Sequence, residues 1–391
     1  MTTPPFPRAL FLDWLRIGAL GWLVVYHVMA YYARWPWHVH SPQVDLTGPW
    51  VEPLMRLSSP WRMSLLFLVS GAATAAMLAR DGARGAWLSA RARRLLLPLL
   101  AGVLLIVPPQ SWLEVRDRFG YCGSLPDFMR LYLSADTRFA DAQGRLILPT
   151  WNHLWFLPYL FTYTSALWVL LRVRPQALQA MAQRAPRLLR GWRLALVPLA
   201  APAAAAWLKA TGWPQTHALV DDPASHLLYA PAFVFGAVLV QSPALQRRLQ
   251  AWRWPALGAA LLGWALFASA GRTPPGAAGA VVQSWAALVA LLGFAQRHLD
   301  RDHRWRAPLA DAVFPVYLLH QTVIVVLAVA LRPVALHPLA EGPLLVAAVL
   351  LAGAAFHRAV RPWAALRPWV GLSPMPARAT RGAAVRVTTG G

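Results

Sequence analysis

The first apolar run of the sequence contains three ionisable residues, Asp13, Arg16 and His27. Each costs roughly 2.5 to 3.5 kcal/mol at the centre of a bilayer helix, so each needs a compensating role. On one helix, Arg16 and His27 would lie about 16 Å apart along the axis and within about 20° of the same face. That stripe could line a cavity in which His27 acts as a general base. The alternatives are an Asp13–Arg16 ion pair at the membrane boundary and an interior histidine held by a hydrogen bond.

A second basic pattern precedes a later apolar run, where Arg91 and Arg94 are three residues apart with Arg93 between them. On a helix, Arg91 and Arg94 share a face that Arg93 does not. Two guanidinium groups on one face suit a phosphate or pyrophosphate group. The alternative is ordinary positive charge at a cytoplasmic helix end, and the spacing alone favours that alternative.

Two further histidines, His153 and His320, occur in other apolar runs, and either could face His27. The alternatives are an interfacial histidine among aromatic residues for His153 and a helix-to-helix hydrogen bond for His320. Ser70 and Gly71 stand in the middle of another apolar run. Small residues there indicate close helix packing or a narrowed channel.

Aromatic residues gather in two segments that we expect near the outer surface, around Trp37 and His38 and around Trp155. Flat aromatic faces beside hydrogen-bonding groups suit a sugar, although an aromatic belt accounts for most of them equally well. His38 and His40 have no set of cysteines or carboxylates close in the sequence, so we expect no metal site.

The composition of the 391 residues is that of a membrane protein, with 58% hydrophobic and 13% charged residues and a mean hydropathy of +0.43. A soluble chain would have roughly 25% charged residues. Arginine supplies 36 of the 37 basic residues behind the net charge of +22. Their placement between apolar runs indicates membrane topology rather than a nucleic-acid partner. Cys122 is the only cysteine, which excludes an intramolecular disulfide and a cysteine metal site.

We expect an all-α polytopic membrane protein, a single bundle of about ten transmembrane helices over residues 1–372, followed by a disordered cytoplasmic tail, 373–391. The third helix is the one that prolines interrupt. The ten helices are predicted at about 10–33, 62–79, 95–109, 151–171, 194–209, 226–241, 254–270, 278–296, 312–331 and 343–358.

The distribution of basic residues predicts the orientation of these helices. With ten helices and the N-terminus in the cytoplasm, 26 basic residues fall on the cytoplasmic face and 11 on the other. The positive-inside rule therefore favours an even number of helices with both termini in the cytoplasm. The two longest connections, about 34–61 and 110–150, then lie on the outer face, where connections of this length are usually functional.

The sequence resembles the family-3 membrane acyltransferases over most of its length. Arg16 and His27 are similar to the first-helix signature of that family, and Arg91 and Arg94 to its basic motif. The Ser70–Gly71 helix, the segment 152–157 and the segment 317–320 follow in matching order. Phe11–Asp13, Trp37–Val39 with Ser41, and Arg62–Met63 most resemble the glucans biosynthesis protein C branch.

This resemblance implies an O-acyltransferase of the bacterial inner membrane that moves a succinyl group from cytosolic acyl-CoA to hydroxyl groups of a periplasmic glucan. Sister branches acetylate lipopolysaccharide, peptidoglycan or exopolysaccharide. Acyl-CoA is then a co-substrate, with no tightly bound cofactor, and the partners are membrane lipid and the polysaccharide acceptor, with a homodimer left open.

The hypothesis for the site assigns each predicted residue a role. His27 is the base, and His320 or His153 stabilises the oxyanion or binds the sugar. Arg16, Arg91 and Arg94 bind the phosphates of acyl-CoA, and Asp13 orients Arg16. Trp37, His38, Trp155 and His153 are expected to bind the sugar acceptor.

Two other function classes remain open from the sequence. A polysaccharide or anion transporter would use the same intramembrane charges as a substrate pathway, although no inverted repeat supports it. A scaffold subunit of a glucan synthase would need neither His27 nor Arg91. The absence of an ATP-binding signature disfavours a primary pump.

Overall fold

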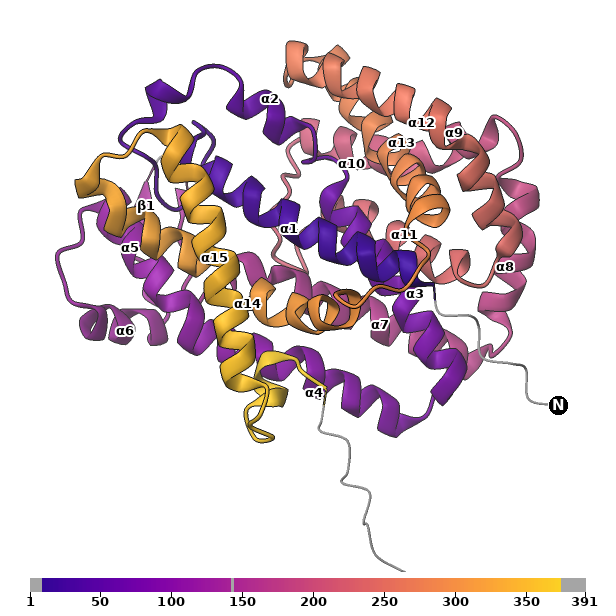
Figure 1. Cartoon of the computed structure of the whole chain (residues 1–391), viewed down its shortest axis with the longest axis horizontal. Helices are drawn as coiled ribbons and strands as arrows, with labels where there is room; N and C mark the ends of the chain where they lie inside the picture. Colours follow the sequence, from indigo (N-terminus) through magenta and orange to yellow (C-terminus); the bar gives the residue numbers. More distant parts are fainter. Residues whose placement is uncertain (1–8, 142–143, 374–391) are drawn as a thin grey trace, which may run out of the picture.

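Helices make up most of the chain in the computed structural model, which describes residues 9–141 and 144–373 (Figure 1). The α-helices and β-strands, in chain order, are α1 Leu10–Tyr32, α2 Val51–Arg56, α3 Arg62–Asp81, α4 Gly85–Ala101, α5 Val107–Phe119, α6 Leu125–Leu133, β1 Ala140–Asp141, β2 Gly144–Arg145, α7 Phe156–Val173, α8 Ala177–Leu188, α9 Arg193–Leu196, α10 Ala200–Ala210, α11 Pro223–Leu239, α12 Pro243–Ala270, α13 Pro274–His298, α14 Arg306–Leu331 and α15 Pro338–Val360. The short helical turns are η1 Val44–Thr47, η2 Gly102–Ile106, η3 Asn152–Trp155, η4 Val197–Leu199, η5 Arg332–Val334 and η6 Arg367–Val370.

Helix α1 occupies the middle of the bundle. It contacts α3, α13, α14 and α15, and Figure 1 shows it crossing the centre of the view. Because α1 is one unbroken helix, Arg16 and His27 lie about 16 Å apart along its axis and within about 20° of one face, as the sequence predicts. His27 therefore lies inside the bundle, whereas Arg16 lies near one end of α1 with its side chain 37% exposed.

Two helix pairs pack backbone against backbone at glycines. A Cβ atom added to Gly71 of α3 would lie 1.9 Å from the carbonyl oxygen of Phe233 in α11, and one added to Gly236 would lie 1.9 Å from the carbonyl oxygen of Leu68. Gly263 of α12 and Gly279 of α13 approach each other's carbonyl oxygens in the same way, at 2.6 Å. Gly71 therefore permits close helix packing, which is the first of the two interpretations of the small residues in α3.

The third predicted helix, about 95–109, is longer in the structure. Helix continues from Gly85 through α4, the π-helical turn η2 and α5 to Phe119. Prolines at 98, 108 and 109 lack the backbone N–H that a regular turn needs, and the wider turn η2 lies between Pro98 and Pro108. The prolines thus change the local geometry without ending the helix, so the prediction that a loop begins at residue 110 is wrong.

The two long connections carry structure of their own. The first contains η1 and α2, and the second contains the end of α5, then α6 and the hairpin β1–β2. A separate small core of buried apolar residues holds the second connection together, namely Val115, Phe128, Tyr132, Phe139 and Leu148. These connections are therefore ordered enough to present side chains to the bundle.

Seven of the described helices are long and apolar enough to cross a membrane, and up to nine spans result if each of two bent helix pairs counts as one. These pairs are α8 with 193–210, bent by 119°, and α11 with α12, bent by 113°. All ten predicted segments are helical, and the all-α polytopic architecture fits the described chain. The count of ten spans and the cytoplasmic termini stay predictions. The predicted tail lies outside the described residues from 374 onward.

Candidate active site

His27 of α1 and His320 of α14 form a hydrogen-bonded pair inside the bundle. The Nδ1 atom of His27 lies 3.1 Å from Nε2 of His320, and Nδ1 of His320 lies 2.6 Å from the carbonyl oxygen of Tyr317. Since a carbonyl oxygen only accepts, Nδ1 of His320 carries the hydrogen and Nε2 of the neutral ring accepts. His27 therefore donates from Nδ1, and its Nε2 carries a lone pair that no other described residue uses.

His153 of η3 packs against this pair from the side of α7. Its ring lies 5.0 Å from that of His320, edge to face, and its Nε2 donates to the carbonyl oxygen of Leu318 at 3.0 Å. Its Nδ1 is buried with no hydrogen-bond partner among the described residues. The hydroxyl of Tyr317 donates to the carbonyl oxygen of His153 at 2.8 Å. The structure thus brings together the three histidines that the sequence singles out.

This arrangement limits what the two outer histidines can do. In its neutral form, His320 uses one nitrogen as a donor to Tyr317 and the other as an acceptor from His27. Neutral His153 donates its only N–H to the carbonyl oxygen of Leu318. Neither ring offers a free N–H in this geometry, so the predicted role of His320 or His153 in stabilising an oxyanion would require a rearrangement.

Trp37 and Tyr26 cover the ring of His27. The Trp37 ring is stacked on it with centroids 6.5 Å apart and an interplanar angle of 17°, and the Tyr26 ring meets it edge-on at 5.7 Å. Trp37, one of the predicted acceptor residues, thus lies directly at the candidate base. An aromatic face at this place could carry the apolar face of a sugar.

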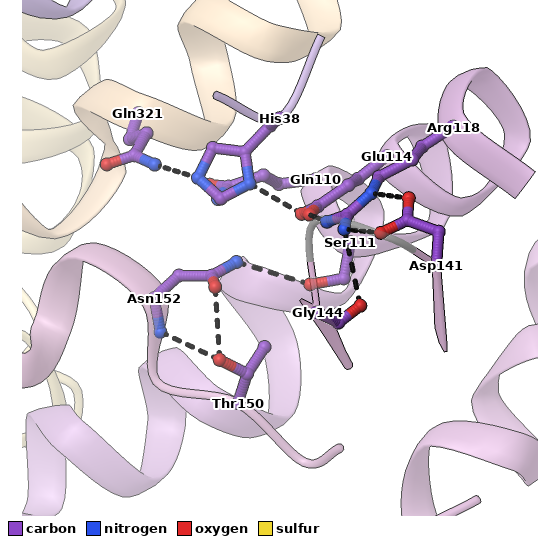
Figure 2. A network of polar contacts seen from close by, with 10 residues as sticks. All are labelled: His38, Gln110, Ser111, Glu114, Arg118, Asp141, Gly144, Thr150, Asn152 and Gln321. Atoms are coloured by element: carbon purple, nitrogen blue, oxygen red, sulfur yellow. Dashed lines mark hydrogen bonds and ion pairs between the residues drawn. The ribbon is translucent and has the colours of Figure 1, made fainter. Parts of the chain in front are cut away.

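His38, whose ring lies 5.6 Å from that of Trp37, forms the centre of a polar network (Figure 2). Its Nδ1 lies 2.5 Å from Oε2 of Glu114, which accepts the hydrogen bond. Its Nε2 then accepts from the side-chain amides of Gln110, at 3.0 Å, and Gln321. Glu114, Gln110 and Gln321 are all buried. A carboxylate thus orients the imidazole, and a dense set of donors and acceptors lies next to the histidine pair.

The same network reaches the second long connection. Arg118 binds the carboxylate of Asp141, with Nε 2.6 Å from Oδ2, and lies 3.9 Å from Glu114. Asn152 donates to the hydroxyl of Ser111 at 3.3 Å, and Figure 2 shows both residues below His38. The hairpin and η3 are therefore tied to the outer part of α5, which presents Gln110 and Glu114 inward.

Sequence reasoning missed Gln110, Glu114 and Gln321. Gln110, Glu114 and Arg118 are four residues apart, a spacing that places them on one face of a helix. This signal was hidden because the sequence interpretation ended the helix at Pro109. Gln321 follows His320 directly and gave no pattern of its own.

Arg16, Arg91 and Arg94 gather at the opposite end of α1, which we call the arginine end. Arg91 lies within electrostatic range of both Arg94 and Arg16, and Arg94 lies within range of Arg16. Arg16 donates to the carbonyl oxygen of Ala310 at 3.1 Å, and Arg94 donates to the hydroxyl of Ser373 at 3.2 Å. Three guanidinium groups brought together in this way are suited to an anion, and their predicted binding of the phosphates of acyl-CoA stays a prediction.

Asp13 has a different main partner from the predicted one. Its Oδ2 lies 2.5 Å from Nη1 of Arg306, whereas Nη2 of Arg16 lies 3.9 Å from its Oδ1. Arg306 is buried and also binds Asp302 at 2.8 Å. Asp13 therefore connects α1 to the start of α14, with Arg16 as the weaker partner, and leaves the guanidinium of Arg16 directed to α14.

Trp155 lies in a separate aromatic group. Its ring is stacked on His217 with centroids 3.9 Å apart, and it contacts Tyr229 at 5.4 Å. Burial lowers the pKa of His217 to about 4, although the nearby carboxylate of Asp222 opposes this. Trp155 thus packs on His217, in the connection before α11, and on Tyr229 of α11, rather than on the histidine pair.

A pocket of about 490 Å³ opens beside the first long connection and α2, near the Tyr32 end of α1 and so away from the arginine end. Its lining includes Tyr32, Arg34, Asp45 and Glu52, but none of the predicted site residues. His40 points elsewhere, with Nε2 2.9 Å from the carbonyl oxygen of Trp35. Among residues 9–141 and 144–373, no group of three histidine, cysteine or acidic side chains could hold a metal ion.

Comparison with known sequences identifies the family to which this chain belongs. The sequence profile described as an acyltransferase domain matches residues 10–358, nearly the whole chain. Proteins named Glucans biosynthesis protein C from Escherichia coli strains SMS-3-5 / SECEC and SE11 are 26% identical over 175 residues, which is 44% of this chain. The match covers 42% of those relatives, so the aligned part spans less than half of their length. No solved structure matches.

Proposed function

Because the chain belongs to the family-3 membrane acyltransferases, we propose that it moves an acyl group from cytosolic acyl-CoA to hydroxyl groups of a periplasmic glucan in the bacterial inner membrane. Succinyl is the expected acyl group. The name of the relatives supports a glucan acceptor. The single observation that carries the proposal is the bond from His27 to His320, which leaves Nε2 of His27 unprotonated and ready to accept a proton.

His27 acts as the general base in this proposal. Its Nε2 takes the proton of the acceptor hydroxyl while the hydroxyl oxygen attacks the thioester carbonyl carbon. The tetrahedral intermediate then collapses, the C–S bond breaks, and the imidazolium returns the proton to the departing thiolate. His320 accepts from Nδ1 of His27 throughout and so stabilises the imidazolium by hydrogen bonding.

The arginine end holds the nucleotide part of acyl-CoA. Arg16, Arg91 and Arg94 offer several N–H donors to its phosphates, and guanidinium groups suit such groups because two parallel hydrogen bonds form at once. The stripe on α1 that leads from Arg16 to His27 covers about 16 Å, a gap that the long pantetheine arm would span. The thioester then lies at His27 while the phosphates stay at the arginines.

The acceptor approaches from the side of the long connections. Trp37 supplies an aromatic face next to His27, and His38 with Gln110 and Gln321 supplies donors and acceptors for sugar hydroxyls. Sugars are commonly bound by such a pairing of an aromatic face with planar polar side chains. An O-acetyltransferase acting on another polysaccharide would use the same base and differ in these neighbours and in its donor.

The test uses purified full-length protein in lipid vesicles, with release of CoA from succinyl-CoA measured in the presence and absence of periplasmic glucan. Wild type should release CoA faster with glucan and should yield acylated glucan. His27→Ala should lower the rate by about 10²–10⁴-fold, because a positioned base contributes that much. His298→Ala is the matched control, since His298 is exposed at the end of α13. Substantial turnover by His27→Ala would disprove the assignment of the base.

A further inference from the structure

Arg62 is a buried cation with no carboxylate partner in the described part of the chain. It is the first residue of α3 and its side chain is buried. No carboxylate within residues 9–141 and 144–373 forms an ion pair with it, although most other buried or half-buried arginines here contact a carboxylate or several carbonyl oxygens. A buried guanidinium costs free energy unless opposite charge or hydrogen bonds compensate it.

The contacts of Arg62 compensate it only in part. Its Nη1 donates to the hydroxyl of Ser58 at 3.0 Å, and its guanidinium carbon lies 3.4 Å from the centroid of the Tyr26 ring. A guanidinium has five N–H donors, and the buried Nε of Arg62 has no hydrogen-bond partner in the described chain. The positive end of the α3 dipole adds to the local positive potential. The surroundings of Arg62 therefore favour an anion.

Arg62 lies next to the histidine pair. It interacts electrostatically with both His27 and His320, and the Tyr26 ring that it covers lies 5.7 Å from the ring of His27. The three arginines that suit the phosphates of acyl-CoA are at the other end of α1. The anion that forms near Arg62 during acyl transfer is the oxyanion of the tetrahedral intermediate, and neither His320 nor His153 has a free N–H to bind it.

We propose that Arg62 is a catalytic residue that stabilises this oxyanion, an inference that rests on the proposed function. As the hydroxyl oxygen bonds to the thioester carbon, the carbonyl oxygen gains the negative charge and accepts hydrogen bonds from Arg62. When the intermediate collapses, the charge leaves with the thiolate and the carbonyl re-forms. The unpaired cation in the resting protein is then a donor prepared in advance, which is how such stabilisation works efficiently.

The test compares wild type, Arg62→Gln and Arg62→Lys in lipid vesicles with two donors, succinyl-CoA and acetyl-CoA. Arg62→Gln should lower kcat by about 10²–10³-fold for every donor that wild type accepts and leave KM within about threefold, as expected for loss of one oxyanion donor. Arg62→Lys keeps the positive charge, so its kcat should lie between those of wild type and Arg62→Gln. Arg34→Gln is the control, because Arg34 is exposed and pairs with Asp45.

Folding is checked by the thermal unfolding temperature of each variant. Arg62→Gln should unfold within a few degrees of wild type, because no partner carboxylate is left unpaired. A loss confined to succinyl-CoA would overturn the proposal, since Arg62 would then bind the acyl carboxylate. A rise in KM with kcat unchanged would also overturn it. Wild type that releases CoA from neither donor would overturn the proposed function together with this inference, whereas active wild type with unimpaired Arg62→Gln would overturn the inference alone.

Discussion

The Nε2 atom of His320 lies 3.1 Å from Nδ1 of His27, and the carbonyl oxygen of Tyr317 holds the other nitrogen of His320 at 2.6 Å. His320 can therefore only accept from His27 while it is neutral, which selects one tautomer of the candidate base. An aspartate has the equivalent task in serine hydrolases, where it orients a catalytic histidine. Here a backbone carbonyl and a second imidazole share that task.

Replacing His320 should therefore slow the reaction without weakening donor binding. In His320→Ala, the His27 ring is free to place its proton on Nε2, so we expect kcat to fall by about 100-fold or more with KM for acyl-CoA unchanged. His320→Gln should keep more activity, because its amide oxygen can still accept from Nδ1. Steady-state kinetics in lipid vesicles measures both constants. A His320→Ala variant with the kcat of wild type would show that the pair is only structural.

The arginine end should control donor affinity. We expect Arg91→Gln and Arg94→Gln each to raise KM for acyl-CoA about tenfold and to leave kcat nearly unchanged, because a charge-assisted hydrogen bond to a phosphate is lost in ground state and transition state alike. CoA alone should raise the thermal unfolding temperature of wild type and do so less in these variants. Arg184→Gln is the control, since Arg184 is exposed on α8. If CoA left the thermal unfolding temperature of wild type unchanged, the result would favour a transporter of another substrate over an acyl-CoA-dependent enzyme.

Glu114 should act on the acceptor half of the reaction. In Glu114→Gln, the amide can still contact His38 but no longer supplies a carboxylate, so the ring loses its strongest partner. We expect KM for the glucan to rise about tenfold or more, while release of CoA without glucan stays at the wild-type rate. Glu52→Gln provides the comparison, because Glu52 pairs with Arg56 outside this network. Equal losses with and without glucan would place Glu114 in the donor half instead.

Gly71 should be essential for the packing of α3 on α11. A Cβ atom there would lie 1.9 Å from the carbonyl oxygen of Phe233, so Gly71→Ala must push the helices apart. We expect a loss of about 1–3 kcal/mol of stability, measured as a lower thermal unfolding temperature in detergent. Gly258→Ala is matched in chemistry, and nothing lies within 4 Å of its added Cβ, so it should be neutral or slightly stabilising. If Gly71→Ala and Gly258→Ala changed the unfolding temperature equally, the close contact between Gly71 and Phe233 would be contradicted.

Much of the interior could be predicted from local sequence. Arg16 and His27 are on one helix, so the geometry of α1 alone relates them. Arg91 and Arg94 share a helix face for the same reason, and the helical character of all ten apolar runs follows from their length and hydropathy. These features depend on residues within about three turns of each other, where the helix period determines the outcome.

The partners that come from distant segments could not be predicted in the same way. Asp13 binds Arg306, almost 300 residues away, because the packing of α1 on α14 decides which cation lies nearest. Glu114 reaches His38 only because helix persists beyond Pro109. That Arg62 has no carboxylate partner within the described residues depends on the packing of many elements, since each of them could have placed an acidic side chain beside it.

The π-helical turn Gly102–Ile106 adds one residue to a turn of the long helix that ends at Phe119. One residue corresponds to a rotation of about 100° around the helix axis, so this turn determines which side of the helix each α5 side chain occupies. A chain shortened by one residue there would stay helical but would turn Gln110 and Glu114 away from His38, so a single deletion could separate the proposed acceptor site from the proposed base His27.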